Sequence, residues 1–68
     1  MSVYKVVELI GTSDKSWEEA AKNAVEQASK TLRQLRVAEV KELDMSIDDG
    51  GKITYRAKVN LSLKYEGD

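Results

Sequence analysis

The sequence predicts an α+β fold in which a three-stranded antiparallel sheet wraps around one amphipathic helix, in the order β-α-β-β. Apolar residues recur every three or four positions over 16–35, which is one face of an α-helix. Apolar and polar residues alternate over 53–65, as in a strand buried on one face. The turn sequence DDGG at 48–51 joins that strand to an apolar segment before it. We expect a single domain, 1–68.

The first strand is predicted over 3–10, where β-branched and apolar residues dominate. It is expected to end at a turn over 11–14 that leads into the helix. In this turn, Gly11 is expected to supply a backbone angle that a side chain would forbid.

The helix is predicted to begin at Ser16 and to run to about Leu35. Ser16 and Glu19 have the spacing of a capping box, in which each satisfies a free backbone amide of the other. Acidic residues in the first turn and the basic residues Lys30 and Arg33 near the end complement the helix dipole. The apolar face is mostly alanine, so we expect the sheet to approach the helix closely.

The second strand is predicted over 37–47, with a change of phase inside it. One extra residue near Lys41, a β-bulge, brings the apolar residues on both sides of it to the helix-facing surface. If residue 48 faces residue 52, Asp44 opposes Arg56 and Glu42 opposes Lys58 on the other surface, and both are favourable charge pairs. This register places Leu43, Met45 and Ile47 of the second strand on the buried face. Upstream of the bulge, it places Val37 and Glu39 on the outer face.

The composition excludes several classes of protein. Without cysteine or histidine the chain has no disulfides and no Cys/His zinc site, and no catalytic nucleophile has an obvious base, so we expect no enzymatic activity. The net charge of -1 without a basic block disfavours nucleic acid as a partner. No apolar run approaches the roughly 20 residues of a membrane span, and the N-terminus lacks the pattern of a signal peptide, so we expect a cytoplasmic protein. We expect a polar tail at 67–68. A chain this small with a long exposed edge strand is marginal alone, so we expect a closed homo-oligomer.

Four stretches of the chain, VYKVVELIGTS, SWEEAA, KTLRQLRVAEVKE and ITYRAKVNLSLKYE, resemble the dodecin family over essentially the whole length. The resemblance implies a hollow homododecamer, with the helices outside and the sheets around a cavity, that binds and stores a small ligand. Many dodecins hold flavins stacked in pairs at two-fold axes, some carry coenzyme A, and a subset binds calcium. The stretches MSVYKV, SWE, RVA and GKITYR are closer to the calcium-binding subset.

The family's flavin pocket corresponds here to Val37, Asp44, Met45 and Arg56. Flavin-binding dodecins have a tryptophan at the position of Val37, and its loss removes stacking worth about 1–3 kcal/mol per ring by analogy with base stacking. They also have a glutamine at the position of Arg56, which donates and accepts, whereas arginine only donates. Asp44 stands where some members have a basic residue. We expect Asp44 and Arg56 to pair and to fill the space of the flavin ring.

Two other sets of residues are candidate ligand contacts. The first set is acidic and could bind a hard cation such as calcium, which requires about six to eight oxygen ligands that several copies of the chain can supply together. The simpler interpretation of these acidic residues is a polar turn with salt bridges. The metal candidates are Glu42, Asp44 and Asp48, and the candidate phosphate or coenzyme A contacts, which could equally be solvated surface residues, are Tyr4, Lys5, Lys30, Arg33 and Lys64. Trp17 is expected to be a core or interface anchor.

The sequence therefore predicts a binding and storage protein of the dodecin type whose flavin site is degraded and whose ligand is calcium or another divalent cation. One alternative is weak binding and storage of FMN or riboflavin. The other is a structural shell without a small ligand.

Overall fold

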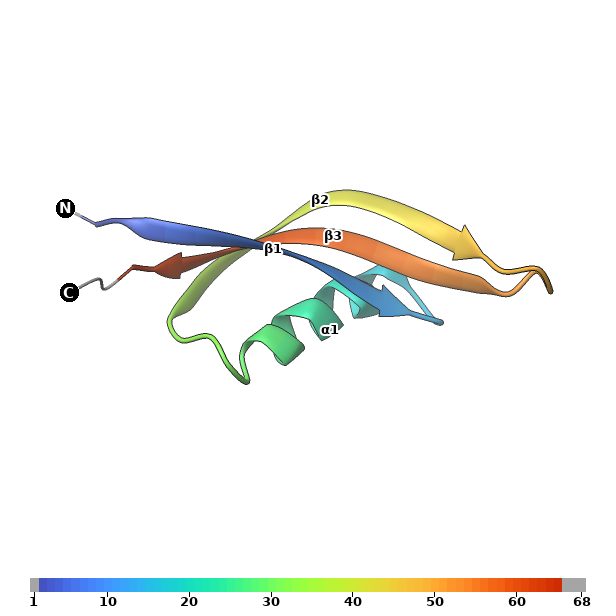
Figure 1. Cartoon of the computed structure of the whole chain (residues 1–68), viewed down its shortest axis with the longest axis horizontal. Coiled ribbons are helices and arrows are strands. Elements are labelled where there is room, and N and C mark those ends of the chain that lie inside the picture. Colours follow the sequence, from blue (N-terminus) through green and yellow to red (C-terminus); the bar gives the residue numbers. More distant parts are fainter. Residues whose placement is uncertain (1, 66–68) are drawn as a thin grey trace.

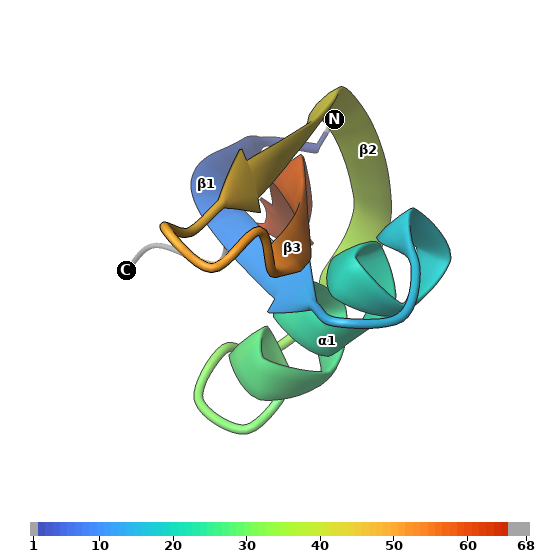
Figure 2. The same cartoon turned by 90° about the vertical axis from the view of Figure 1, so that its right-hand side faces the viewer.

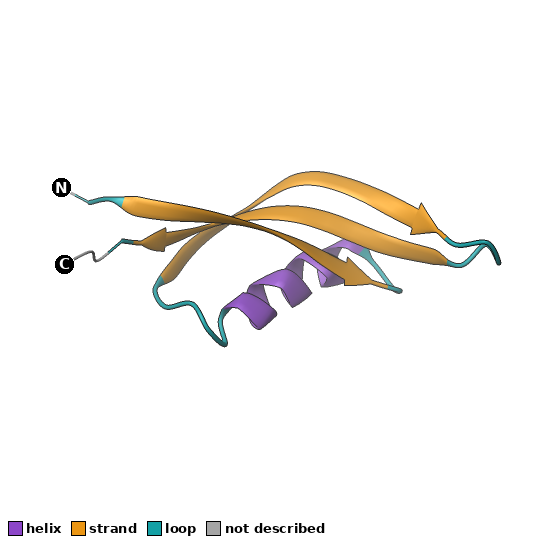
Figure 3. Cartoon of the chain, viewed as in Figure 1, coloured by secondary structure: helices purple, strands orange, loops and turns teal. Residues whose placement is uncertain are grey.

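The protein folds as the predicted β-α-β-β unit. In the computed structural model, which describes residues 2–65, the elements are β1 (Tyr4–Ser13), α1 (Trp17–Ala28), β2 (Leu35–Ile47) and β3 (Ile53–Lys64). The antiparallel sheet has the strand order β1-β3-β2, so the last strand lies in the middle. The sheet arches over α1, which lies on its concave side, and the hairpin of β2 and β3 extends past the helix (Figures 1 and 3). Residues 67–68, the predicted tail, lie outside the described part of the chain.

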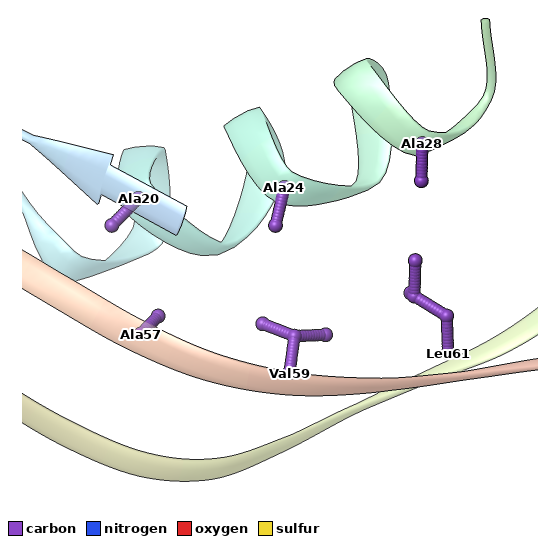
Figure 4. Close-up of a cluster of buried hydrophobic side chains, with 6 residues drawn as sticks. All are labelled: Ala20, Ala24, Ala28, Ala57, Val59 and Leu61. Atoms are coloured by element: carbon purple, nitrogen blue, oxygen red, sulfur yellow. The ribbon is translucent and has the colours of Figure 1, made fainter. Parts of the chain in front are cut away.

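The core is a thin layer between α1 and β3. Three side chains of each element are buried, and they face one another in Figure 4. They are Ala20, Ala24 and Ala28 of α1, and Ala57, Val59 and Leu61 of β3. Because the fully buried side chains of the helix are methyl groups, its backbone lies close to the sheet, as the alanine face predicts.

Gly11 does not lie in a turn, contrary to the prediction. β1 continues to Ser13, and Gly11 pairs with Ala57 inside the strand. A Cβ atom at Gly11 would lie 1.9 Å from the carbonyl oxygen of Ala20 and 2.9 Å from the Cβ of Ala24. Glycine is therefore needed because the helix crosses the strand here, whereas among residues 2–65 the glycine with a positive φ is Gly51, at 85°.

The start of α1 agrees with half of the predicted capping box. The Ser16 hydroxyl oxygen accepts a hydrogen bond from the Glu19 amide at 3.0 Å, and acidic residues occupy the first turn. The amide of Ser16 itself donates to the Ser13 hydroxyl at 3.4 Å. Ser13 thus takes the place that the prediction gave to the Glu19 side chain.

The helix ends at Ala28, and the prediction that it reaches Leu35 is wrong. Ser29 caps the end of the helix: its amide donates to the Val25 carbonyl at 2.9 Å, and its hydroxyl donates to the Glu26 carbonyl at 2.8 Å. Gln34 then takes a left-handed backbone conformation (φ 59°) that turns the chain into β2. The last helical turn has no basic residue, so the expected complement to the helix dipole at this end is absent, because Lys30 and Arg33 belong to the following loop.

The predicted register of the β2–β3 hairpin is confirmed. Asp44 pairs with Arg56 and Glu42 with Lys58, and the register shifts near Lys41, where the bulge was expected. A second shift between Leu35 and Val37 was not predicted.

The helix covers β1 and β3 and leaves β2 open, which corrects the expected burial of the second strand (Figure 2). Leu43, Met45 and Ile47 do pair with the helix-facing residues of β3, yet they are 50%, 46% and 68% exposed. The short α1 cannot reach across all three strands. Within residues 2–65, no helix is both long and apolar enough to cross a membrane.

Candidate ligand site on the outer face of the sheet

The surface of the sheet turned away from α1, here called the outer face, carries most of the paired charges. Directly opposed residues on neighbouring strands share a face. The outer-face residues of β2 are therefore Val37, Glu39, Glu42 and Asp44, opposite Ser62, Asn60, Lys58 and Arg56 of β3 and Val6, Glu8, Ile10 and Thr12 of β1. This register confirms that Val37 and Glu39 lie on the outer face, and it confirms the two charge pairs.

Asp44 and Arg56 form a two-pronged ion pair across the hairpin. Arg56 donates from Nε to Asp44 Oδ1 at 2.6 Å and from Nη2 to Oδ2 at 3.0 Å. The hydrogen bond from Arg56 lowers the pKa of Asp44, and the same bond raises the pKa of Arg56. The expected pair is thus present, and its charged form is favoured.

A second pair lies beside the first. Lys58 Nζ is 3.2 Å from Glu42 Oε1. This hydrogen bond is the main cause that raises the pKa of Lys58, and the charges of Glu42, Glu8 and Asp44 add to it. Because Glu42 is largely exposed and Lys58 is partly exposed, this pair stabilises the fold only weakly. The effect of the two pairs is to order the carboxylates of β2 on the outer face.

Trp17 anchors the start of the helix to the hairpin from the other side of the sheet. Its indole Nε1 donates to the backbone carbonyl of Asp44 at 2.9 Å, and its ring meets Tyr55 edge to face with centroids 5.1 Å apart. Below it, an apolar groove of about 590 Å³ runs between α1 and β2. The residues that line this groove are Trp17, Glu18, Ala21, Val40 and Leu43.

One chain does not bring the flavin-pocket positions together. Val37 and Asp44 share the outer face, but their β3 partners, Ser62 and Arg56, are about 20 Å apart at roughly 3.3 Å per residue. Met45 pairs with a helix-facing residue, so its side chain lies on the opposite surface. A ligand that contacts both Val37 and Asp44 must therefore lie between two copies of the chain.

The metal candidates are also dispersed. Glu42 and Asp44 are neighbours on the outer face, whereas Asp48 lies about 13 Å beyond Asp44 at roughly 3.3 Å per residue. Asp48 Oδ1 accepts hydrogen bonds from the amides of Gly50 and Lys52, both at 2.9 Å, and so closes the turn. Among residues 2–65, no three acidic side chains converge on one point. A cation held mainly by carboxylates would need them from more than one chain.

The candidate phosphate contacts gather at the opposite end of the sheet, on both surfaces. Tyr4 and Lys64 are paired on the outer face, while Lys5 pairs with Leu63 on the helix side. Lys30 and Arg33 lie in the loop between α1 and β2, whose Gln34 accepts from the Lys64 amide at 3.1 Å. The five candidate contacts, Tyr4, Lys5, Lys30, Arg33 and Lys64, are therefore divided between the two surfaces of the sheet. They do not form a single phosphate site within one chain.

Asn60 is an outer-face residue that the sequence reasoning missed. It lies in the central strand between Glu8 and Glu39, and its Oδ1 is buried without a hydrogen-bond partner among the described residues. Its signal in the sequence is an amide at a polar position of the alternating strand, between the polar positions of Lys58 and Ser62. An unpartnered amide oxygen beside two carboxylates is chemically suited to a hard cation.

Comparisons with known proteins match nearly the whole chain. The family model for dodecins matches residues 3–66. The calcium dodecin of Mycobacterium tuberculosis is 55% identical over 64 residues, which cover 94% of this chain and 90% of that protein. The dodecin of Thermus thermophilus is 41% identical over 94% of this chain and 93% of its own length.

Solved structures agree with these sequence matches. The crystal structure of the M. tuberculosis calcium dodecin, described as calcium-chelating with a novel calcium-binding site, has a TM-score of 0.88 at 51% identity and covers 98% of this chain and 96% of that one. The dodecin of Streptomyces coelicolor has a TM-score of 0.89 at 34% identity, with 98% and 96% covered.

Proposed function

The chain belongs to the dodecin family, and we propose that it is a non-enzymatic, self-assembling protein that binds and stores calcium or another divalent cation in place of flavin. The proposed assembly is the hollow homododecamer that the family resemblance implies. The cation would lie on the outer face, between copies.

The ion pair between Asp44 and Arg56 carries this proposal. It closes the position at which the resemblance places the edge of the flavin ring, and it does so with two hydrogen bonds, at 2.6 and 3.0 Å. Val37 adds no aromatic surface on which a ring could stack. The outer face therefore opposes a flat aromatic ligand and presents oxygen atoms instead.

Those oxygen atoms suit a hard cation. Each carboxylate offers roughly four lone-pair sites, so the pairing of Asp44 with Arg56 and of Glu42 with Lys58 leaves acceptor positions free. Calcium requires about six to eight oxygen ligands, so a second copy must complete the shell, and Asp48 can contribute only from such a copy. The 55% identity to a protein named calcium dodecin supports the same choice of ion.

The test is the thermal stability of the purified assembly, because a ligand that binds the folded state raises its melting temperature. We expect an increase with calcium that EDTA abolishes, and no increase with FMN. An increase with FMN together with quenching of its fluorescence would support the flavin alternative, and no change with either ligand would support the empty shell.

Variants locate the site. Asp44→Asn and Glu42→Gln should each reduce the calcium-dependent increase, whereas Asp14→Asn, an exposed carboxylate in the loop before α1, should leave it unchanged. The double variant Val37→Trp/Arg56→Gln should gain affinity for FMN in a fluorescence titration. An unchanged FMN affinity in this variant would contradict the role given to the ion pair.

A further inference from the structure

The carboxylates that are proposed to hold a cation are already paired with basic side chains of the same chain. Asp44 and Glu42 are neighbours on the outer face of β2, and each lies opposite a basic residue of β3. Both carboxylate oxygens of Asp44 accept hydrogen bonds from Arg56, and the Glu42 carboxylate lies 3.2 Å from Lys58 Nζ. The negative charge of both residues is therefore balanced within the chain before any ion arrives.

From this arrangement we propose that Arg56 is a tethered competitor of the cation. Calcium binds fully to Asp44 only when the guanidinium of Arg56 leaves it, and Arg56 returns to Asp44 when the ion is released. This inference rests on the proposed cation function and adds the regulation of that site. Its consequence is a lower affinity and a readily reversible uptake, as a storage protein requires.

The geometry of the pair explains why the two cations compete. Arg56 donates from Nε and Nη2 to the two different oxygens of Asp44, at 2.6 and 3.0 Å. The remaining lone pairs of Asp44 admit an ion, but an ion there stands beside the guanidinium, and the two positive charges repel each other. The Arg56 side chain is 40% exposed, so it can move into solvent without uncovering a buried group.

Arg56 is a stronger competitor than Lys58 because of the acidic residues around each. Asp44 is the one carboxylate directly opposite Arg56 on the neighbouring strands. Lys58 bonds Glu42, but the charge of Glu8 on β1 also raises the pKa of Lys58, so a second carboxylate is near. Lys58 can therefore turn from Glu42 toward Glu8 when an ion arrives. Arg56 has no such second position among the residues directly opposite it.

The competition also determines which ions the site accepts. A monovalent ion that replaces Arg56 exchanges one positive charge for another and breaks two charge-assisted hydrogen bonds. A divalent ion brings twice the charge to Asp44 and so compensates for the loss of those bonds. We therefore expect the outer face to discriminate against sodium and potassium in favour of divalent cations.

Calorimetric titration of the purified assembly with calcium chloride, at constant ionic strength, tests the proposal. We expect Arg56→Gln to bind calcium about tenfold more tightly, because the competing charge is gone. Arg56→Lys keeps the charge but loses the two-pronged contact, so we expect it to bind about threefold more tightly. Lys58→Gln should gain no more than about twofold, because Lys58 is the weaker competitor.

Lys64→Gln is the matched control. Lys64 is exposed on the outer face, and its replacement changes the net charge as Arg56→Gln does. It lies on the same strand about 26 Å from Arg56 at roughly 3.3 Å per residue, beyond the distance at which exposed charges interact in physiological salt. Its calcium affinity should therefore stay within about twofold of the unsubstituted protein. Circular dichroism verifies that each variant is folded.

The outcomes separate this inference from the function on which it rests. If the unsubstituted protein binds calcium, an unchanged or weaker affinity of Arg56→Gln, or an equal gain in Lys64→Gln, overturns the competition and keeps the cation function. Equal affinities of Arg56→Lys and the unsubstituted protein also overturn it, because net charge alone would then act. Calcium binding by Arg56→Gln alone would keep Arg56 as the competitor and reject the cation function of the native chain. Binding by neither protein overturns both.

Discussion

The two long sides of this molecule are built in opposite ways. On the side of β1 and β3, α1 buries Ala20, Ala57 and Val59 completely. On the side of β2, all residues after Leu35 are exposed, including Ile47 at 68%. One side is stabilised by contacts within the chain, and the other presents apolar and charged groups that no element of the same chain covers.

This difference separates what folds the chain from what joins it to others. The core is small because four of its six buried residues are alanine, so the folded chain has little apolar burial of its own. The hairpin of β2 and β3 extends a molecule that measures 50 × 20 × 17 Å, and most of its surface has no role in that core. Mutations on the packed side should therefore change the stability of the folded chain, and mutations on the open side should change its association with other chains.

The largest effect is expected from Leu61→Ala. Leu61 is 1% exposed and is the largest fully buried side chain, so its truncation should cost about 2–5 kcal/mol of unfolding free energy. Ile47→Ala should change the stability of the dissociated chain by no more than about 0.5 kcal/mol, because Ile47 is mainly exposed there. Urea unfolding at matched chain concentration measures both. A comparable loss for the two variants in the dissociated chain would contradict the division of the molecule into two sides.

A smaller but still clear effect is expected from Gly11→Ala. The added Cβ would overlap the carbonyl oxygen of Ala20, so the helix must move away from β1 at a cost of about 1–3 kcal/mol. Gly50→Ala is the matched control, since its Cβ would meet Asp48 Oδ1 at an ordinary 3.5 Å. Thermal melts of the two variants compare a glycine on the packed side with one on the open hairpin. Equal melting temperatures would mean that the helix and strand are not in close contact.

The smallest effect is a pH dependence that belongs to the open side. Because the folded chain lowers the pKa of Asp44, the ion pair with Arg56 contributes stability above the ordinary aspartate pKa, near 3.8, and loses it as the pH falls through the lowered value. The raised pKa of Lys58 gives a contribution that is complete below the ordinary lysine pKa and is lost as the pH rises through the folded value. Asp44→Asn should therefore flatten the acid limb of a plot of melting temperature against pH and leave the alkaline limb. An unaltered acid limb would show that the pair does not contribute.

Local patterns predicted the hairpin well. The strict alternation of β3 and the two charge pairs at Asp44 and Glu42 fix the register, because a shift by one residue would reverse every side chain. The change of phase then requires the bulge near Lys41, which is where the register shifts. The register predicted from the sequence is therefore sufficient to predict the outer-face pair of Asp44 and Arg56.

Features that depend on the distance between elements could not be predicted in this way. Leu32 and Leu35 continue the helical period, but tertiary pairing assigns Leu35 to β2, so periodicity overestimated the helix. Gly11 was attributed to backbone conformation because sequence does not show that α1 crosses it. The separation of Val37 and Asp44 follows from their spacing along one strand, whereas no pattern along a chain shows how a second copy would lie beside them.

The single tryptophan of the chain has a practical value because of where it lies. Trp17 touches Tyr55 and hydrogen-bonds the carbonyl of Asp44, so its emission spectrum is sensitive to the hairpin and to the groove at the open edge. Since no other residue contributes indole fluorescence, the protein carries its own optical probe beside the open edge of the sheet. Assembly and ligand uptake can be followed in real time on the unmodified molecule, without a label that would alter the surface under study.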